Sequence, residues 1–120
     1  MDLLHLFLEF TWHIIKAVLG IGNGSVNTYK PSNKGYVYFV QGVNGGPIKI
    51  GYSAYLDKRL SNLQTGNAEQ LKMIAYIPGD IGLEKRLHKK FDKYRIRPDG
   101  EWFVDCEDIR NFISINCFKA

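Results

Sequence analysis

Tyr38 and Lys49 are the first two residues whose types and spacing indicate chemistry. Each lies in a short run of β-branched and aromatic residues, "GYVYFV" at 35–40 and "PIKIGY" at 47–52, and the two positions are eleven apart. If the runs pair as a hairpin, the phenol and the ammonium group share one face. A cation beside a phenol favours the phenolate, which can act as a general base. A tyrosine ring packed over a lysine stem on a solvated face is the alternative.

The segment between the two runs, "QGVNGG", predicts the hairpin, since its Asn44-Gly45 pair favours a type I′ turn. A turn closed on this pair puts Val40 opposite Lys49, and a turn shifted by one residue on each strand puts Tyr38 there. Because side chains alternate along a strand, both registers leave the tyrosine and the lysine on one face. The isoleucines on either side of the lysine then face the core.

The remainder of the chain predicts further helices and one more strand. Leucines at helical spacing predict a helix over 54–64, and "QLKMIAYIP" predicts a third strand over 70–78. A second helix is expected to follow Asp80 and a last one to follow Asp105, since aspartate caps helix N-termini. The expected fold class is therefore α/β (α+β), with a small three-stranded, mainly antiparallel sheet flanked by helices.

These motifs together resemble the GIY-YIG nuclease superfamily. The resemblance rests on "VYFV" and "IKIG", on Arg59 in "LDKRL", and on "RLSNLQTGN", "IAYIPG", "EKRLHKKF" and "GEWF" in that order, over roughly residues 35–113. It is closest to the branch from phages, viruses and bacteria whose second motif reads KIG. The resemblance implies a GIY-YIG-like nuclease domain over residues 35–120.

The resemblance also implies a role for each matching residue. Tyr38 matches the tyrosine that acts as general base or positions the attacking water, and Lys49 replaces the tyrosine of the second motif. Arg59 matches the arginine that holds the scissile phosphate. Glu84 matches the glutamate that binds one divalent ion, Mg²⁺ or another such as Mn²⁺. His88 matches a histidine of this branch and completes the expected catalytic set.

The chemistry of these side chains agrees with those roles. Phosphodiester cleavage needs an in-line nucleophile, a cation on the developing charge and help for the leaving oxygen. A guanidinium can contact phosphate through two hydrogen bonds, and a single carboxylate suits magnesium, which keeps most of its waters. Glu84 and His88 are four residues apart, so they project from one face of the predicted helix. Without the family pattern they would be read as a surface Glu–His pair.

Basic residues are concentrated in the middle of the chain. From Lys30 to Arg97 there are thirteen Lys and Arg against five Asp and Glu, whereas the rest of the chain has three against seven. The net charge of +4 therefore understates a basic region that favours a polyanionic partner, of which nucleic acid is the commonest, and the resemblance implies DNA. Lys85, Lys89 and Arg95 are the candidate nucleic-acid-binding residues. A solvated charged surface is the alternative.

Residues 1–21 predict an amphipathic helix, and residues 22–34, rich in Gly, Asn and Ser, predict a flexible linker. The helix carries one stripe of polar residues: Asp2, His5, Glu9, His13 and Lys16. A stripe of this kind argues against a transmembrane span. Residues 1–20 are therefore expected to pack on the domain, to associate with a second copy, to bind a protein partner, or to lie on a membrane surface.

The two cysteines, Cys106 and Cys117, stand too far apart on one predicted helix to form a disulfide. Reduced thiols predict an intracellular protein, in the cytoplasm or, if viral, in the host cytoplasm or nucleus.

The complete pattern predicts a metal-dependent endonuclease of the GIY-YIG type that hydrolyses DNA phosphodiester bonds. A non-catalytic nucleic-acid-binding or adaptor module that keeps the fold is the alternative.

Overall fold

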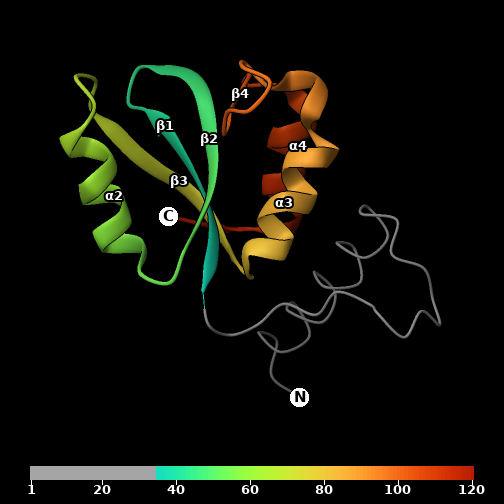
Figure 1. Cartoon of the computed structure of the whole chain (residues 1–120), viewed down its shortest axis with the longest axis horizontal. Coiled ribbons are helices and arrows are strands. Elements are labelled where there is room, and N and C mark those ends of the chain that lie inside the picture. Colours follow the sequence, from blue (N-terminus) through green and yellow to red (C-terminus); the bar gives the residue numbers. More distant parts are fainter. Residues whose placement is uncertain (1–34) are drawn as a thin grey trace.

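The computed structural model describes residues 35–120, which form one antiparallel sheet and three α-helices (Figure 1). The α+β class is confirmed. The helix expected over 1–21 and the linker expected over 22–34 lie outside the described residues.

The sheet has five strands, so the expectation of three was wrong. In the order of the sheet the strands are β4 (Trp102–Phe103), β2 (Gly45–Ser53), β1 (Tyr36–Gly42), β3 (Leu71–Pro78) and β5 (Phe118–Lys119). Every neighbouring pair is antiparallel. The two strands that were missed contain two residues each, which is too short to show the alternation by which a strand is recognised in a sequence.

The three helices are α2 (Leu56–Thr65), α3 (Ile81–Lys90) and α4 (Glu107–Asn116). Asp80 caps α3, as expected, and its side chain accepts a hydrogen bond from the Leu83 backbone N–H at 3.1 Å. The expected cap at Asp105 is wrong, because Cys106 holds the N-cap position of α4. The Asp105 carboxylate instead binds the guanidinium of Arg110 at 2.8 Å.

The β1–β2 hairpin is confirmed, with Val40 paired to Lys49. The type I′ turn is not confirmed. Gly45 and Gly46 have positive φ angles, both 95°, and no residue other than glycine in 35–120 has a positive φ. The turn falls on Val43 and Asn44 and is followed by a glycine in the positive-φ region, with a shift of register beside it. This arrangement fits a turn closed by a bulge, for which glycine supplies the required φ.

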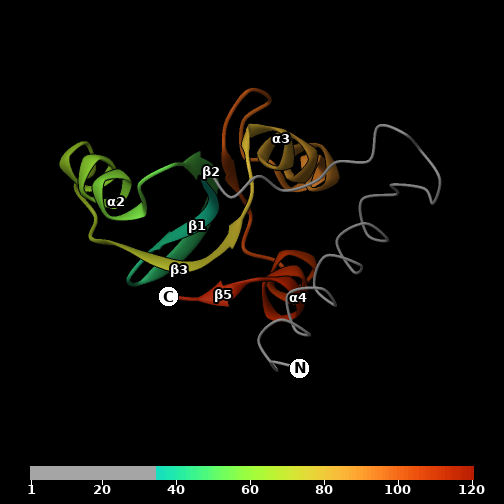
Figure 2. The ribbon, with the colours of Figure 1, turned by 90° about the horizontal axis from the view of Figure 1, so that it is seen from below.

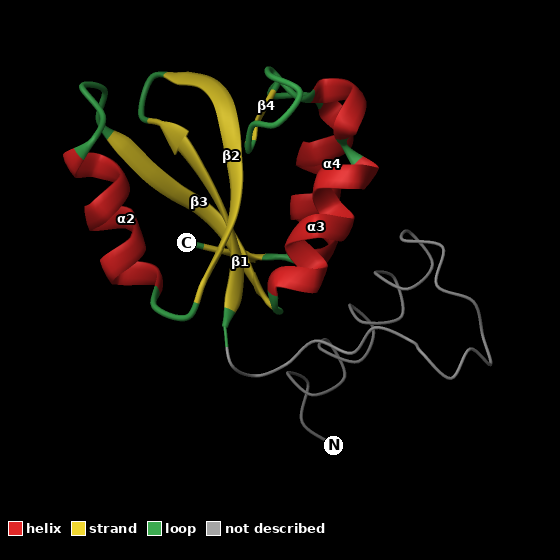
Figure 3. Ribbon diagram, in the orientation of Figure 1, coloured by secondary structure: helices red, strands yellow, loops and turns green. Residues whose placement is uncertain are grey.

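The sheet separates two helical layers, with α2 on one side and α3 and α4 on the other (Figures 2 and 3). The layer with α3 and α4 buries Val37, Phe39 and the two isoleucines of β2, as the alternation predicted. On the other face, α2 covers Tyr38 and Val40. Tyr38 is therefore only 2% exposed, and its ring does not lie on a solvated face.

None of the helices within residues 35–120 has the length and hydropathy that a membrane span requires.

Candidate active site

The hairpin directs Tyr38 and Lys49 to the face of the sheet that α2 covers. Tyr38 pairs with Gly51 in the observed register. The tyrosine ring lies so close to this glycine that a Cβ added at position 51 would stand 2.3 Å from the Tyr38 Oη atom. A residue without a side chain is therefore required here for the ring to occupy its place.

Burial raises the pKa of the Tyr38 phenol to about 12. The Arg59 guanidinium lowers this pKa, whereas the carboxylates of Glu101 and Glu84 raise it further. Desolvation thus outweighs the nearby cation, and the phenol keeps its proton at neutral pH. This is the reverse of the phenolate expected from a neighbouring lysine.

The Lys49 ammonium is bound to Glu101. Its Nζ atom lies 2.7 Å from Oε2 of Glu101 and 5.7 Å from the centroid of the Trp102 ring. The Lys49 side chain is 13% exposed and the Glu101 side chain 44%. The carboxylate is therefore the exposed partner of this ion pair, and the ammonium lies on its buried side.

Glu101 is a site residue whose position could not be located from the sequence. Its backbone carbonyl accepts a hydrogen bond from the Ile50 N–H at 3.0 Å, and the next residue, Trp102, pairs with Lys49 across β4 and β2. These backbone contacts bring the carboxylate to the ammonium. The only signal in the sequence was an acidic residue in "GEWF", and a two-residue strand offers no periodicity to orient it.

Two side chains of α3 bind the outer edge of β2 beyond the end of β4. The Glu84 carboxylate accepts a hydrogen bond from the backbone of Tyr52, and His88 Nε2 donates to the carbonyl oxygen of Ile50 at 2.7 Å. Residues four apart on a helix are about 6 Å apart along its axis, and residues two apart on a strand about 6.6 Å. Because the two spacings nearly match, the side chains of Glu84 and His88 can bind alternate residues along the edge of β2.

Burial raises the pKa of the Glu84 carboxyl group. The Glu101 carboxylate raises it further, whereas His88, Lys49 and the Tyr52 hydrogen bond lower it. Two carboxylates that repel one another in a partly desolvated place form a setting that a divalent cation would stabilise. Glu84 therefore fits a magnesium ligand by its chemistry and by its surroundings.

The part of the chain that the structure describes contains no group of three or more His, Cys, Asp and Glu side chains arranged to hold a metal ion. Zinc, which takes three or four protein ligands, does not suit such a place. Magnesium and manganese keep several waters and need one or two carboxylates, so the Glu84 position suits them.

Arg59 reaches the site from α2. Its backbone N–H donates to the Tyr55 carbonyl at 3.1 Å, which closes the first turn of the helix. The side chain is exposed, and its charge acts on the Tyr38 phenol. No hydrogen bond or ion pair of the guanidinium occurs among residues 35–120, so its donors are open to an anionic ligand.

The three basic residues expected to bind nucleic acid do not share one surface. Lys85 and Lys89 are exposed and lie one turn apart on α3. The Arg95 guanidinium instead donates to the carbonyl of Gly100 at 3.2 Å and to that of His88 at 3.0 Å. With these bonds it ties the loop after α3 to the helix, so it is not presented with the two lysines.

In a comparison with protein families, the model of the T5orf172 domain matches residues 35–117, which is more than half of the chain. Searches of curated proteins and of solved structures found no match.

Gly51→Ala is expected to lower the free energy of unfolding by about 1–3 kcal/mol, since the added methyl group must displace the buried Tyr38 ring. Urea denaturation measures this change. Gly66→Ala is the matched control, because its Cβ would meet no atom within 4 Å and its φ is −92°. Equal effects of the two substitutions would show that Tyr38 does not need the space above Gly51.

His88→Leu is expected to destabilise the domain by about 1–3 kcal/mol, because the carbonyl of Ile50 loses its donor at the edge of β2. His88→Gln keeps an N–H donor and should retain more of the stability in the same urea experiment. A glutamine variant less stable than the leucine variant would contradict the hydrogen-bonding role.

Proposed function

Since the chain belongs to the T5orf172 domain family, a GIY-YIG-related and nuclease-like family, we propose that it is a metal-dependent endonuclease that hydrolyses DNA phosphodiester bonds. The observation that carries this proposal is the convergence of Tyr38, Lys49, Arg59 and Glu84, which lie close enough for their charges to act on one another. The "IKIG" sequence around Lys49 supports placing the chain in the KIG-bearing branch.

Arg59 is proposed to hold the scissile phosphate. Its guanidinium is exposed, lies near the Tyr38 phenol and has donors that no described residue occupies. Such a group can donate two hydrogen bonds to one phosphate and stabilise the charge that develops during cleavage. The scissile phosphate is thereby expected beside the phenol.

Tyr38 is proposed to position the attacking water. With a pKa of about 12 the phenol is protonated at neutral pH, so it offers a hydrogen-bond donor and a weak acceptor rather than a ready base. The buried ring is held by the close approach to Gly51, which fixes the direction of the hydroxyl. The raised pKa therefore favours positioning over proton abstraction for this tyrosine.

Lys49 is proposed to act on the phosphate or the leaving oxygen. The ion pair with Glu101 at 2.7 Å holds the ammonium in the site before substrate arrives. A phosphate oxygen would compete with the carboxylate for the same donor. Glu101 is in this account a positioning residue for Lys49.

Glu84 is proposed to bind Mg²⁺ or a similar ion such as Mn²⁺. A bound divalent cation would add positive charge next to the phosphate and so stabilise the transition state. The residue supplies one hard oxygen ligand and is oriented by its hydrogen bond to the Tyr52 backbone.

Lys85 and Lys89 are proposed to contact the DNA backbone, since they are exposed on the helix that carries Glu84. Contacts of this kind weaken as salt rises and do not depend on sequence.

The two thiols, Cys106 and Cys117, are free, which is consistent with the intracellular location that we propose.

A nicking assay on supercoiled plasmid with Mg²⁺ tests the proposal. Glu84→Ala and Arg59→Ala are each expected to lower the rate by about 100-fold or more, the loss that accompanies removal of one group acting on the developing charge. Glu107→Ala is the control for Glu84→Ala, and Lys58→Ala is the control for Arg59→Ala. Each control removes a charge of the same sign from an exposed residue and should keep the wild-type rate.

Equal nicking by all these preparations would contradict the assignment of the site. Plasmid binding without nicking in any divalent metal would instead indicate the non-catalytic nucleic-acid-binding module.

The pH dependence of the rate gives a second test. The ionised Glu84 carboxylate binds the cation, and Glu101 raises the pKa of that group. Glu101→Gln removes the repelling charge, lowers this pKa, and is expected to move the acid limb of the pH–rate profile to lower pH. An acid limb that stays in place or moves to higher pH would contradict this coupling. Glu107→Gln is the control and should leave the profile unchanged.

A further inference from the structure

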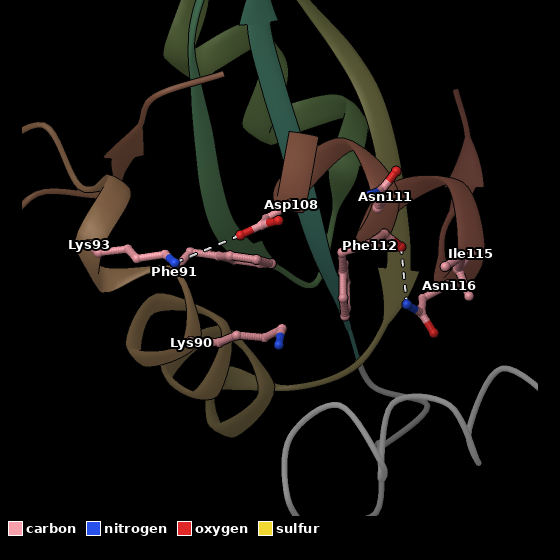
Figure 4. A pocket seen from close by; sticks show the side chains of 8 residues that line it. All are labelled: Lys90, Phe91, Lys93, Asp108, Asn111, Phe112, Ile115 and Asn116. Carbon is pink, nitrogen blue, oxygen red and sulfur yellow. Dashed lines mark hydrogen bonds and ion pairs between the residues drawn. The ribbon is translucent and has the colours of Figure 1, made fainter. Parts of the chain in front are cut away.

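A groove of about 370 Å³ lies between α4 and the C-terminal end of α3 (Figure 4). The groove is on the side of the sheet opposite Tyr38. Its base is formed by the rings of Phe91 and Phe112, whose centroids are 5.9 Å apart. Ile115 lies at its rim and is 49% exposed. Phe91 and Phe112 are only 2% and 4% exposed, so the apolar surface that is open to solvent at the groove is mainly that of Ile115.

A buried side-chain amide in the wall of the groove makes only part of the hydrogen bonds available to it. Asn116 is 2% exposed, and its Nδ2 donates to the Phe112 carbonyl at 3.1 Å. Its Oδ1 atom has no hydrogen-bond partner. An unsatisfied buried acceptor costs about 1–3 kcal/mol, so a donor that enters the groove would stabilise the domain.

The described part of the chain begins one helix length from this groove. The carbonyl of Gly35 accepts a hydrogen bond from the Gly79 N–H at 3.0 Å, and α3 starts two residues later at Ile81. Residues 1–34 are thus attached near the N-terminal end of α3, and the groove is lined by Lys90 at the C-terminal end of the same helix.

The expected linker is long enough to reach all of the groove. The fourteen residues 21–34 have a root-mean-square span of about 20 Å as a flexible chain, and the ten residues of α3 are about 15 Å long. A segment tethered this closely has an effective concentration in the millimolar range. Docking within one molecule is therefore favoured over binding of a second copy.

We propose that residues 1–20 dock as an amphipathic helix in the groove between α3 and α4. The apolar face of this segment, centred on Phe7, would cover Phe112 and Ile115. The hydroxyl of Thr11, four residues after Phe7 and therefore on the same face of the helix, would offer a donor to the Asn116 oxygen.

The polar stripe of the segment agrees with this orientation. Asp2, His5, Glu9, His13 and Lys16 lie opposite Phe7 on a helix, so they would stay exposed to solvent when the apolar face is docked. The contact lies on the far side of the sheet from the phenol, so it is independent of the proposed nuclease activity.

Hydrogen–deuterium exchange of the full chain, read by mass spectrometry, tests the docking. Amides of residues 1–20 are expected to be protected in the wild type. Ile115→Glu should increase their exchange rate by about tenfold or more, the factor expected when burial of one isoleucine side chain is lost. Phe7→Glu should act in the same way from the other side of the contact. Ile96→Glu is the matched control, since Ile96 is 50% exposed and lies outside the groove.

Protection that is lost with Ile115→Glu and Phe7→Glu but kept with Ile96→Glu supports the proposal. Absence of protection in the wild type, or protection that Ile115→Glu leaves unchanged, would overturn it. Protection that grows with protein concentration would overturn it in favour of a second copy, and protection that requires anionic phosphatidylserine vesicles would overturn it in favour of a membrane surface.

Discussion

The hydrogen bonds along the outer edge of β2 are the constraint on which the rest of the site depends. An open strand edge leaves N–H and C=O groups without partners, and β4 covers only two residues of this edge. Glu101 contributes its backbone carbonyl, and α3 contributes Glu84 and His88, which reach alternate residues of the strand. The need to satisfy the backbone therefore brings a carboxylate from α3 and another from the end of β4 to the same place.

The charges assembled in this way balance one another only in part. Lys49 is paired with Glu101, whereas Glu84 remains close to a second carboxylate and its pKa is raised. On the α2 side, Arg59 is exposed while Tyr38 is buried and protonated. A divalent cation and a phosphate would together supply the missing charges, the cation at Glu84 and the phosphate at Arg59. The arrangement is thus a partly desolvated set of groups that suits a metal and a phosphodiester at once.

Much of the fold could be predicted from local patterns. Alternation placed Tyr38 and Lys49 on one face because the hairpin strands are long, with seven and nine residues, and Asp80 identified the start of α3. The two short strands had no pattern to reveal them. The Arg95 guanidinium is directed inward by the carbonyls of Gly100 and His88, which only the fold brings near it. The Tyr38 phenol stays protonated because it is buried under α2. Neither the distances between side chains nor their desolvation is encoded in residue spacing.

The central claim is that one site, at the edge of β2 and the face under α2, holds both a divalent cation and a DNA phosphate. The most direct measurement is anomalous scattering from Mn²⁺ in crystals of the full chain bound to a DNA duplex that carries phosphorothioate linkages. The account predicts a manganese peak on the Glu84 carboxylate and a phosphate within hydrogen-bonding distance of Arg59. Manganese bound away from Glu84, or DNA that approaches neither residue, would contradict it.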